Sequence, residues 1–133
     1  MPVTVTVGVL TTLPFAGVLI AKAGGEIAGC VGLRPLEPGA CEMKRLWVEP
    51  GFAGHGIGRR LAETIIEAAR QIGYQRMRLD TFPDRMTAAQ HLYRTLGFRE
   101  IPPYYDNPFA GVVMLELGLA TSPDPNQRSL PAT

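Results

Sequence analysis

The hydrophobic pattern of this chain changes at Pro50, and the change limits the folds that the chain can adopt. Before Pro50, short apolar runs are separated by turn signals such as Gly24-Gly25, a pattern typical of antiparallel strands joined by hairpins. After it, apolar residues from Gly56 to Ile72 recur every three or four positions, as on one face of a helix. A further strand pattern, Tyr74 to Thr81, follows this helix. We therefore expect a crossover that places the strands on either side of the helix parallel in one sheet.

The patterns predict strands and helices in the order β-β-β-β-α-β-α-β-β. One helix is expected from Gly56 to Ile72, ended by Gly73, and another from about Pro83 to Leu96, ended by Gly97. The expected strands cover residues 3–9, 17–23, 26–33, 42–48, 74–81, 98–101 and 111–119, with a turn at 34–39.

The length of the chain is that of one domain. Its 133 residues are too few for two independent cores, so we expect a single domain over residues 1–121, with an atypical segment at 1–15. Residues 122–133 have little to bury and are expected to form a disordered tail.

The charge and hydropathy of the chain argue against several classes of partner. Thirteen Lys and Arg residues nearly balance twelve Asp and Glu residues, and a net charge of +1 gives no electrostatic case for nucleic acid or an anionic membrane. No apolar run approaches the roughly 20 residues of a spanning helix. The N-terminus also lacks the basic start and apolar core of a signal peptide, so a cytoplasmic protein is expected.

The two cysteines give no sign of a disulfide framework or a metal site. Cys30 and Cys41 are too few for such a framework and lack CxxC or nearby histidine spacing. They could face each other across a hairpin centred near Leu36. We expect buried, reduced thiols and no metal.

Three alternating glycines, Gly54, Gly56 and Gly58, lie where a strand passes into a helix. Glycine lets the backbone approach a ligand closely, and the helix N-terminus adds free N–H groups and the positive end of its dipole. This arrangement can cradle a pyrophosphate, and Arg59 and Arg60 could add charge at its rim. The plain alternative is a flexible turn that begins a helix.

Two other glycine-loop folds fit the segment less well. A P-loop needs Gly-Lys followed by Ser or Thr, whereas Arg59-Arg60 follows Gly58 here. A Rossmann fingerprint needs a third glycine three residues on, where this chain has Leu61, and a glycine almost next to the strand. Five residues separate Val48 from Gly54, and an antiparallel region precedes the loop.

Three segments carry a family resemblance. Residues 42–61 resemble the acetyl-CoA-binding signature of the GNAT superfamily, in which Arg/Gln-x-x-Gly-x-Gly/Ala follows a strand that ends in Val-x-Pro. Residues 89–98 resemble its second signature, Ala-x-x-x-Tyr-x-x-x-Gly-Phe. The loop at 103–108 is similar to that of many bacterial members. The resemblance covers about residues 17–119, and its three matches occur in the family's order.

The resemblance implies both a fold and an activity. The fold is of the α/β (α+β layered) class, a mixed, mostly antiparallel sheet with helices on both faces, shortened here at the N-terminus. The activity is direct transfer of an acetyl group from acetyl-CoA, the co-substrate, to a primary amine of a small-molecule or amino-acid-like acceptor. A non-catalytic acyl-CoA-binding or regulatory module is the main alternative, and a nucleotide-binding protein is a third. An open sheet edge near the N-terminus makes a homodimer conceivable.

The resemblance also implies which residues contact acetyl-CoA. Backbone groups from Leu46 to Val48 would hydrogen-bond the pantetheine arm, with one N–H polarising the thioester carbonyl. The side chain of Trp47 is expected to pack rather than react. The diphosphate would lie against Ala53, Gly54, His55, Gly56, Ile57, Gly58 and Arg59.

Two catalytic roles follow from the same resemblance. An amine is mostly protonated at neutral pH, so a base is useful, and Glu42 matches a position where many members carry that base. Its alternative is an exposed strand carboxylate paired with Lys44 or Arg45. Tyr93 matches the tyrosine that protonates the departing thiolate, and its alternative is a packed core aromatic. Another set of residues could line the acceptor pocket: Tyr104, Tyr105 and Asp106.

The chain departs from the family pattern at three places. Ala53 stands where members usually have Arg or Gln, so a side-chain contact to the diphosphate is missing. Met86 stands where many members have Asn. The family places two helices between its first two strands, but Leu10 to Ala16 is too short for them at about 1.5 Å rise per residue. The first fifteen residues would then form a substitute strand, or the wall would be absent.

Overall fold

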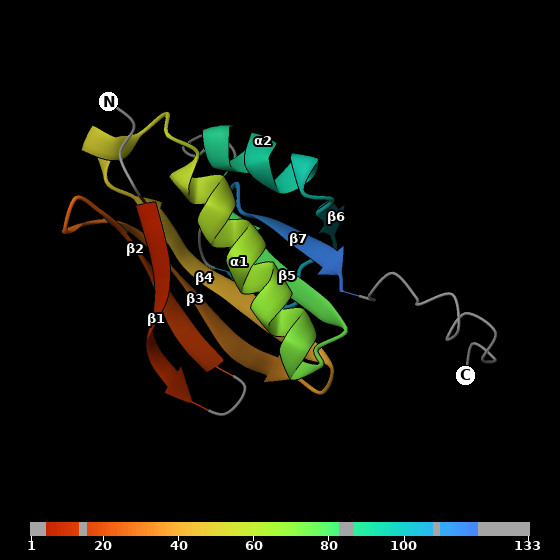
Figure 1. Ribbon diagram of the computed structural model, residues 1–133. Coiled ribbons are helices and arrows are strands. Elements are labelled where there is room, and N and C mark those ends of the chain that lie inside the picture. Colours follow the sequence, from red (N-terminus) through yellow and green to blue (C-terminus); the bar gives the residue numbers. More distant parts are fainter. Residues whose placement is uncertain (1–4, 14–15, 83–86, 108–109, 120–133) are drawn as a thin grey trace, which may run out of the picture.

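The protein forms one seven-stranded sheet with two α-helices. Its structure, a computed structural model, describes residues 5–13, 16–82, 87–107 and 110–119 (Figure 1). The elements are β1 (Val5–Leu13), β2 (Ala16–Ala23), β3 (Glu26–Glu37), β4 (Ala40–Val48), a 3-10 turn η1 (Pro50–Phe52), α1 (Ile57–Ile72), β5 (Arg76–Thr81), α2 (Thr87–Thr95), β6 (Arg99–Ile101) and β7 (Val113–Gly118).

The strands lie in the order β1-β2-β3-β4-β5-β7-β6. Strands β4 and β5 run parallel on either side of the α1 crossover, and every other pairing between described strands is antiparallel. The predicted order of elements, the crossover and the mixed, mostly antiparallel sheet are therefore confirmed.

Glycines end several elements where the sequence predicts them to. Gly24 and Gly25 both have positive φ, 60° and 85°, as a two-residue hairpin requires. Gly73, with φ 110°, ends α1, and its N–H donates to the carbonyls of Ala69 and Arg70. The predicted helix end at Gly97 also takes a positive φ, 102°.

Two local expectations differ from the structure in the β3–β4 hairpin. Residues 34–37 belong to β3 rather than to a turn, because Gly39, with φ 81°, makes the reversal later in the chain. Cys41 consequently pairs with Pro35, whereas Cys30 pairs with Trp47. The cysteines therefore do not face each other, and both are free.

The segment before β2 is a strand, β1, paired with β2 along its length. This result confirms the expectation of a substitute strand within residues 1–15, of which residues 1–4 and 14–15 lie outside the described part. The predicted tail at 122–133 and Met86 also lie outside it.

Both helices lie on the same face of the sheet, which differs from the expected helices on both faces (Figure 1). A Cβ atom at Gly58 of α1 would lie 3.4 Å from Val48 Cγ2 of β4 and 3.8 Å from Leu92 Cδ2 of α2. The reason is topological: the β4–α1–β5 and β5–α2–β6 connections advance in the same direction along the sheet, and right-handed crossovers then place both helices on one side. Neither described helix is both long and apolar enough to cross a membrane.

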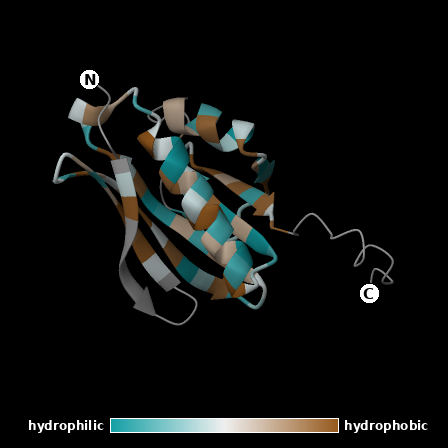
Figure 2. Ribbon diagram, in the orientation of Figure 1, coloured by the Kyte–Doolittle hydropathy of each residue, from teal (hydrophilic) through white to brown (hydrophobic). Residues whose placement is uncertain are grey.

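The two faces of the sheet differ in chemistry. Under the helices lies an apolar core in which α1 contributes Leu61, Ile65 and Ala69. The opposite face carries charged side chains in cross-strand pairs, such as Arg34 with Glu42 and Arg78 with Glu116. Figure 2 shows hydrophilic and hydrophobic residues interleaved along the strands, as this division requires. The helix-free face thus carries these ion pairs, and two large apolar side chains are exposed beside them, Ile27 (54%) and Trp47 (46%).

Two glycines of β3 should respond very differently to substitution by alanine. A Cβ at Gly29 would lie 2.5 Å from the backbone carbonyl oxygen of Trp47. A Cβ at Gly32 would lie 3.4 Å from its nearest neighbour, the backbone carbonyl oxygen of Lys44. We expect Gly29→Ala to lower the free energy of unfolding by about 1–3 kcal/mol because β3 and β4 must separate. Gly32→Ala, the matched control, should change it by less than about 0.5 kcal/mol in urea unfolding. Equal effects would contradict the β3–β4 register.

Candidate functional site

Strands β4 and β5 are paired over only three residues each. Ala40 to Glu42 faces Arg76 to Arg78, and beyond these residues the ladder stops. A cavity of about 200 Å³ opens there, lined from β4, from β5 with Phe82, and from α2 by Tyr93. Backbone groups on this side of β4 after Glu42 therefore have no ladder partner in β5. They are available to an extended ligand, as a β-strand edge is.

A bulge in β4 coincides with this divergence. Cys30 pairs with Trp47 and Gly32 with Lys44, so β4 has one more residue than β3 in this interval. Arg45 lies in the bulge and has φ 57°, in the left-handed region that side chains other than glycine rarely adopt. Its carbonyl accepts a 3.6 Å hydrogen bond from the Cys30 thiol. The bulge turns β4 away while β3 continues to pair with it.

The glycine loop after β4 presents free N–H groups. Gly54 and Gly56 have positive φ, 84° and 74°, and both are exposed. Arg60 is the first residue of this segment whose N–H bonds to a backbone carbonyl, that of Gly56 at 3.1 Å. Among the described residues, no acceptor is bound by the N–H groups of residues 54–59. These donors lie at the positive end of α1, as an anion cradle requires.

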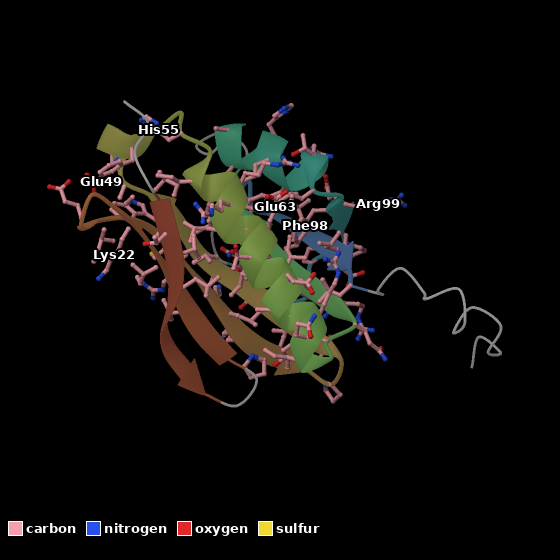
Figure 3. The ribbon with its side chains drawn as sticks, in the orientation of Figure 1. Lys22, Glu49, His55, Glu63, Phe98 and Arg99 are labelled. Atoms are coloured by element: carbon pink, nitrogen blue, oxygen red, sulfur yellow. The ribbon has the colours of Figure 1, made fainter. Side chains whose placement is uncertain are left out.

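Side chains around the loop contribute less than its backbone. The Arg59 guanidinium bonds Thr95 Oγ1 at 3.0 Å and lies 3.3 Å from Glu63 Oε2, so it is turned toward the helices. His55 lies on the exposed loop before α1 (Figure 3). Ala53 is exposed, and its N–H donates to the Pro50 carbonyl. Ile57, by contrast, is buried beneath the loop.

Tyr93 and Thr81 supply polar atoms to the β4–β5 cavity. Tyr93 is 4% exposed, and its ring meets that of Phe98 edge-on at 5.7 Å. Burial, and secondarily the Asp80 carboxylate, raise the pKa of Tyr93 to about 12, so its hydroxyl keeps its proton at neutral pH. The Thr81 hydroxyl is buried and has no hydrogen-bond partner among the described residues. Such an atom favours a polar ligand group in the cavity.

Glu42 is buried rather than exposed. Its carboxylate is 1% exposed and accepts from Arg34 Nε at 2.6 Å and from the Tyr104 hydroxyl at 2.6 Å. Lys44 Nζ lies 3.5 Å away. The contact with Lys44 agrees with the expected alternative, a strand carboxylate paired with a neighbouring cation. The burial of Glu42 and its hydrogen bond from Tyr104 differ from that alternative, which expected an exposed carboxylate.

The loop that carries Tyr104 and Tyr105 is anchored to strand carboxylates. Tyr104 donates to Glu42, and Tyr105 donates to Asp80 while accepting from Asn107 Nδ2 at 2.6 Å. Burial and the bond to Glu42 raise the pKa of Tyr104. Asp106, the third predicted pocket residue, is exposed, and none of the three predicted residues lines either cavity of this region.

Asp80 is a site residue that the sequence analysis did not single out. It lines the β4–β5 cavity and also a second cavity of about 550 Å³, whose other walls are Arg34, Lys44 and Arg45. Lys44 Nζ lies 4.0 Å from its carboxylate. The alternation of residues 74–81 placed Asp80 on the polar face but gave no sign that this position borders both cavities.

A separate apolar hollow of about 530 Å³ lies between the β3–β4 turn and the end of α1. None of its lining residues, Pro35 to Gly39 and Ile72 to Tyr74, belongs to either motif segment or to the glycine loop. The divergence of β4 and β5 is therefore the candidate functional site.

Known proteins resemble this chain in sequence. The family model described as "Acetyltransferase (GNAT) family" matches residues 7–98. An uncharacterized N-acetyltransferase of Schizosaccharomyces pombe is 39% identical over 109 residues, which cover 80% of this chain and 66% of that protein. For the first such relatives, from Schizosaccharomyces pombe, Dictyostelium discoideum and Azospirillum brasilense, the chain spans between 37% and 66% of their length.

Solved structures show the same fold. The IAA acetyltransferase from Bacillus cereus superposes with a TM-score of 0.73 at 19% identity, covering 86% of this chain and 99% of that one. A GNAT family acetyltransferase from Elizabethkingia anophelis with acetyl-CoA bound gives 0.69 at 21% identity, covering 86% and 97%. The fold and the family match define the class: this chain belongs to the GNAT acetyltransferase family, as its motifs predict.

The dependence of stability on alkaline pH should show that the Tyr93 hydroxyl is buried in the folded protein. Its folded-state pKa of about 12 exceeds the value of 10.0 for an exposed tyrosine, so the unfolded chain loses the proton first. The stability that the protonated, buried Tyr93 hydroxyl contributes is fully present below pH 10 and is lost between pH 10 and 12. From pH 9 to pH 11, we expect the wild type to lose about 1 kcal/mol more unfolding free energy than Tyr93→Phe, measured in urea. Parallel losses in the two proteins would contradict a buried hydroxyl.

Proposed function

We propose that this protein is an N-acetyltransferase that moves the acetyl group of acetyl-CoA directly to a primary amine of a small-molecule or amino-acid-like acceptor. The observation that carries the proposal is the divergence of β4 and β5 beside a glycine loop whose N–H groups at 54–59 have no acceptor in the described protein. An extended thioester and a diphosphate are the two ligand groups that such a cleft and such a loop complement.

Acetyl-CoA would be held mainly by backbone groups. The N–H groups of Gly54, His55, Gly56, Ile57, Gly58 and Arg59 would bind the diphosphate. Leu46, Trp47 and Val48 would pair with the pantetheine arm along the edge of β4 that β5 leaves unpaired. The buried Thr81 hydroxyl, which lacks a partner in the described protein, supports a polar ligand group in the same cavity. The Trp47 side chain is exposed on the other face and contributes only its backbone.

The transfer needs a base on one face of the sheet and an acid on the other. Glu42, from the helix-free face, would take a proton from the acceptor ammonium through water, because both its oxygens already accept hydrogen bonds. The amine nitrogen then attacks the thioester carbonyl carbon, an N–C bond forms and the C–S bond breaks. Tyr93 would give its proton to the departing sulfur and regain one from the nitrogen. Of the two protons that the ammonium loses, one ends on CoA and one in solvent.

A non-catalytic acyl-CoA-binding module is the second candidate. The observation that favours it is Ala53, whose exposed methyl group cannot contact a diphosphate as the family's Arg or Gln does. The two candidates agree on binding and differ on turnover, so both are measured below.

Acetyl-CoA should stabilise the chain, and the loop glycines should matter unequally. At about 100 times Kd the ligand adds roughly 2.7 kcal/mol, which a thermal shift detects. Gly56 has φ 74°, so alanine there costs about 1–2 kcal/mol in the binding conformation, and Gly56→Ala should weaken binding about tenfold. Gly51→Ala, where φ is not positive and a Cβ meets nothing within 4 Å, is the matched control and should bind normally. No shift in the wild type would remove both candidates.

Tyr93→Phe should lower turnover and leave the affinity for acetyl-CoA unchanged. The substitution keeps the ring in its packing against Phe98 and removes only the hydroxyl. Loss of a general acid slows transfer by about 10²-fold or more. Thiol release on an amine panel measures kcat, and calorimetry measures binding. Unchanged kcat would exclude Tyr93 from the reaction, and binding without turnover on any amine would favour the non-catalytic module.

A further inference from the structure

The cavity on the helix-free face is unevenly charged. Its lining consists of three cationic side chains, Arg34, Lys44 and Arg45, and one carboxylate, Asp80. We propose that the acceptor is an amino acid, whose carboxylate binds Arg45 and whose amino group lies at Asp80. This inference rests on the proposed acetyl transfer and adds the chemical class of the acceptor.

Two of the three cations already have protein partners. Arg34 Nε bonds Glu42 at 2.6 Å, and Lys44 Nζ lies between Glu42 at 3.5 Å and Asp80 at 4.0 Å. The Arg45 guanidinium has no ion pair or hydrogen bond among the described residues, and the residue is exposed. One cation in this cavity is therefore uncompensated. A carboxylate is the ligand group that the planar guanidinium matches best, through paired N–H donors.

Arg45 lines the cavity in an unusual backbone conformation. Arg45 occupies the β4 bulge with φ 57°, a conformation that costs free energy for any residue except glycine. Lys44 and Arg45, two consecutive residues at this bulge, both line the cavity. The strained residue thus adds a positive charge on the acceptor side, and strain of this kind concentrates where ligands bind.

Asp80 lies beside the position that the amino group of the acceptor would occupy. It borders both the charged cavity and the β4–β5 cavity, where Tyr93 and Thr81 also lie. An ammonium beside this carboxylate would be close to Glu42, because Lys44 contacts both carboxylates. The carboxylate of an amino acid would then extend toward Arg45, which also borders both cavities.

The same charges disfavour polyamines and lysine-rich peptides. A second ammonium on the acceptor would enter a cavity that already holds one uncompensated cation, Arg45, and like charges repel. The cavity volume of about 550 Å³ accommodates a small amino acid, with Tyr104 and Tyr105 bound to the carboxylates beside it.

The decisive variant is Arg45→Asn. Asparagine is neutral and tolerates a positive φ, so the variant should fold. Arg45→Lys keeps the charge without the paired donors. The control Arg99→Asn removes one positive charge from β6, where the exposed side chain extends outward from the sheet (Figure 3). Unfolding in urea establishes that all three variants are folded before any binding is compared.

Binding is measured by calorimetry on the full chain, with a panel of amino acids and, for each, its primary amide and its decarboxylated amine. We expect at least one amino acid to bind more tightly than its amide and its amine. Arg45→Asn should weaken that binding by about 10- to 100-fold, Arg45→Lys less, and Arg99→Asn not at all. The same order is expected for kcat/KM in acetyl transfer, and the amine lacking a carboxylate should be insensitive to Arg45.

Two results would overturn the inference, and they differ in what they say of the enzyme. If amines are acetylated with no preference for a carboxylate, or if Arg45→Asn changes all acceptors equally, the acceptor class is wrong while acetyl transfer stands. If amino acids bind in an Arg45-dependent manner and no amine is acetylated, the transferase proposal fails and the charged cavity is an amino-acid-binding site only.

Discussion

The structure depends on one asymmetry in strand pairing: β4 pairs with β3 over almost its whole length but with β5 over three residues. The bulge at Arg45 adds one residue to β4 at the point where this strand stays paired with β3 but separates from β5. Separation of two strands in the middle of a sheet would normally leave backbone groups unsatisfied. Here it creates a cavity lined by Met43 to Leu46 and Leu79 to Thr81, and a ligand's own amide groups can restore the lost bonds.

The opening between β4 and β5 also connects two different chemical environments. The helix-covered face brings the buried Tyr93 hydroxyl, and the helix-free face brings the paired Glu42 carboxylate and Asp80. A proton donor and a proton acceptor on opposite faces cannot neutralise each other directly. The geometry therefore suits a reaction in which donor and acceptor substrates approach from the two sides and meet at the opening. No described helix covers the polar face, so in the proposed transfer the acceptor would approach from an open side.

Several features were predictable because their causes are local. The Gly24-Gly25 turn, the amphipathic face of α1 and the helix end at Gly73 depend on residues within a few positions of one another. The motifs at 42–61 and 89–98 likewise single out Glu42 and Tyr93 from short stretches of sequence. Asp80 was missed because its importance comes from bordering two cavities. The expectation of helices on both faces came from the resemblance, which the N-terminal strand β1 does not follow.

By itself, the sequence determined the order of strands and helices, the glycine loop and the family, because hydrophobic period and backbone freedom are written in consecutive residues. Only the tertiary structure decided that Glu42 is buried, because its partner Tyr104 lies 62 residues further along the chain. It also decided which cations are compensated: Arg34 and Lys44 reach carboxylates across strands, whereas Arg45 reaches none among the described residues. Such contacts depend on register, and a single bulge shifts every side chain that follows it.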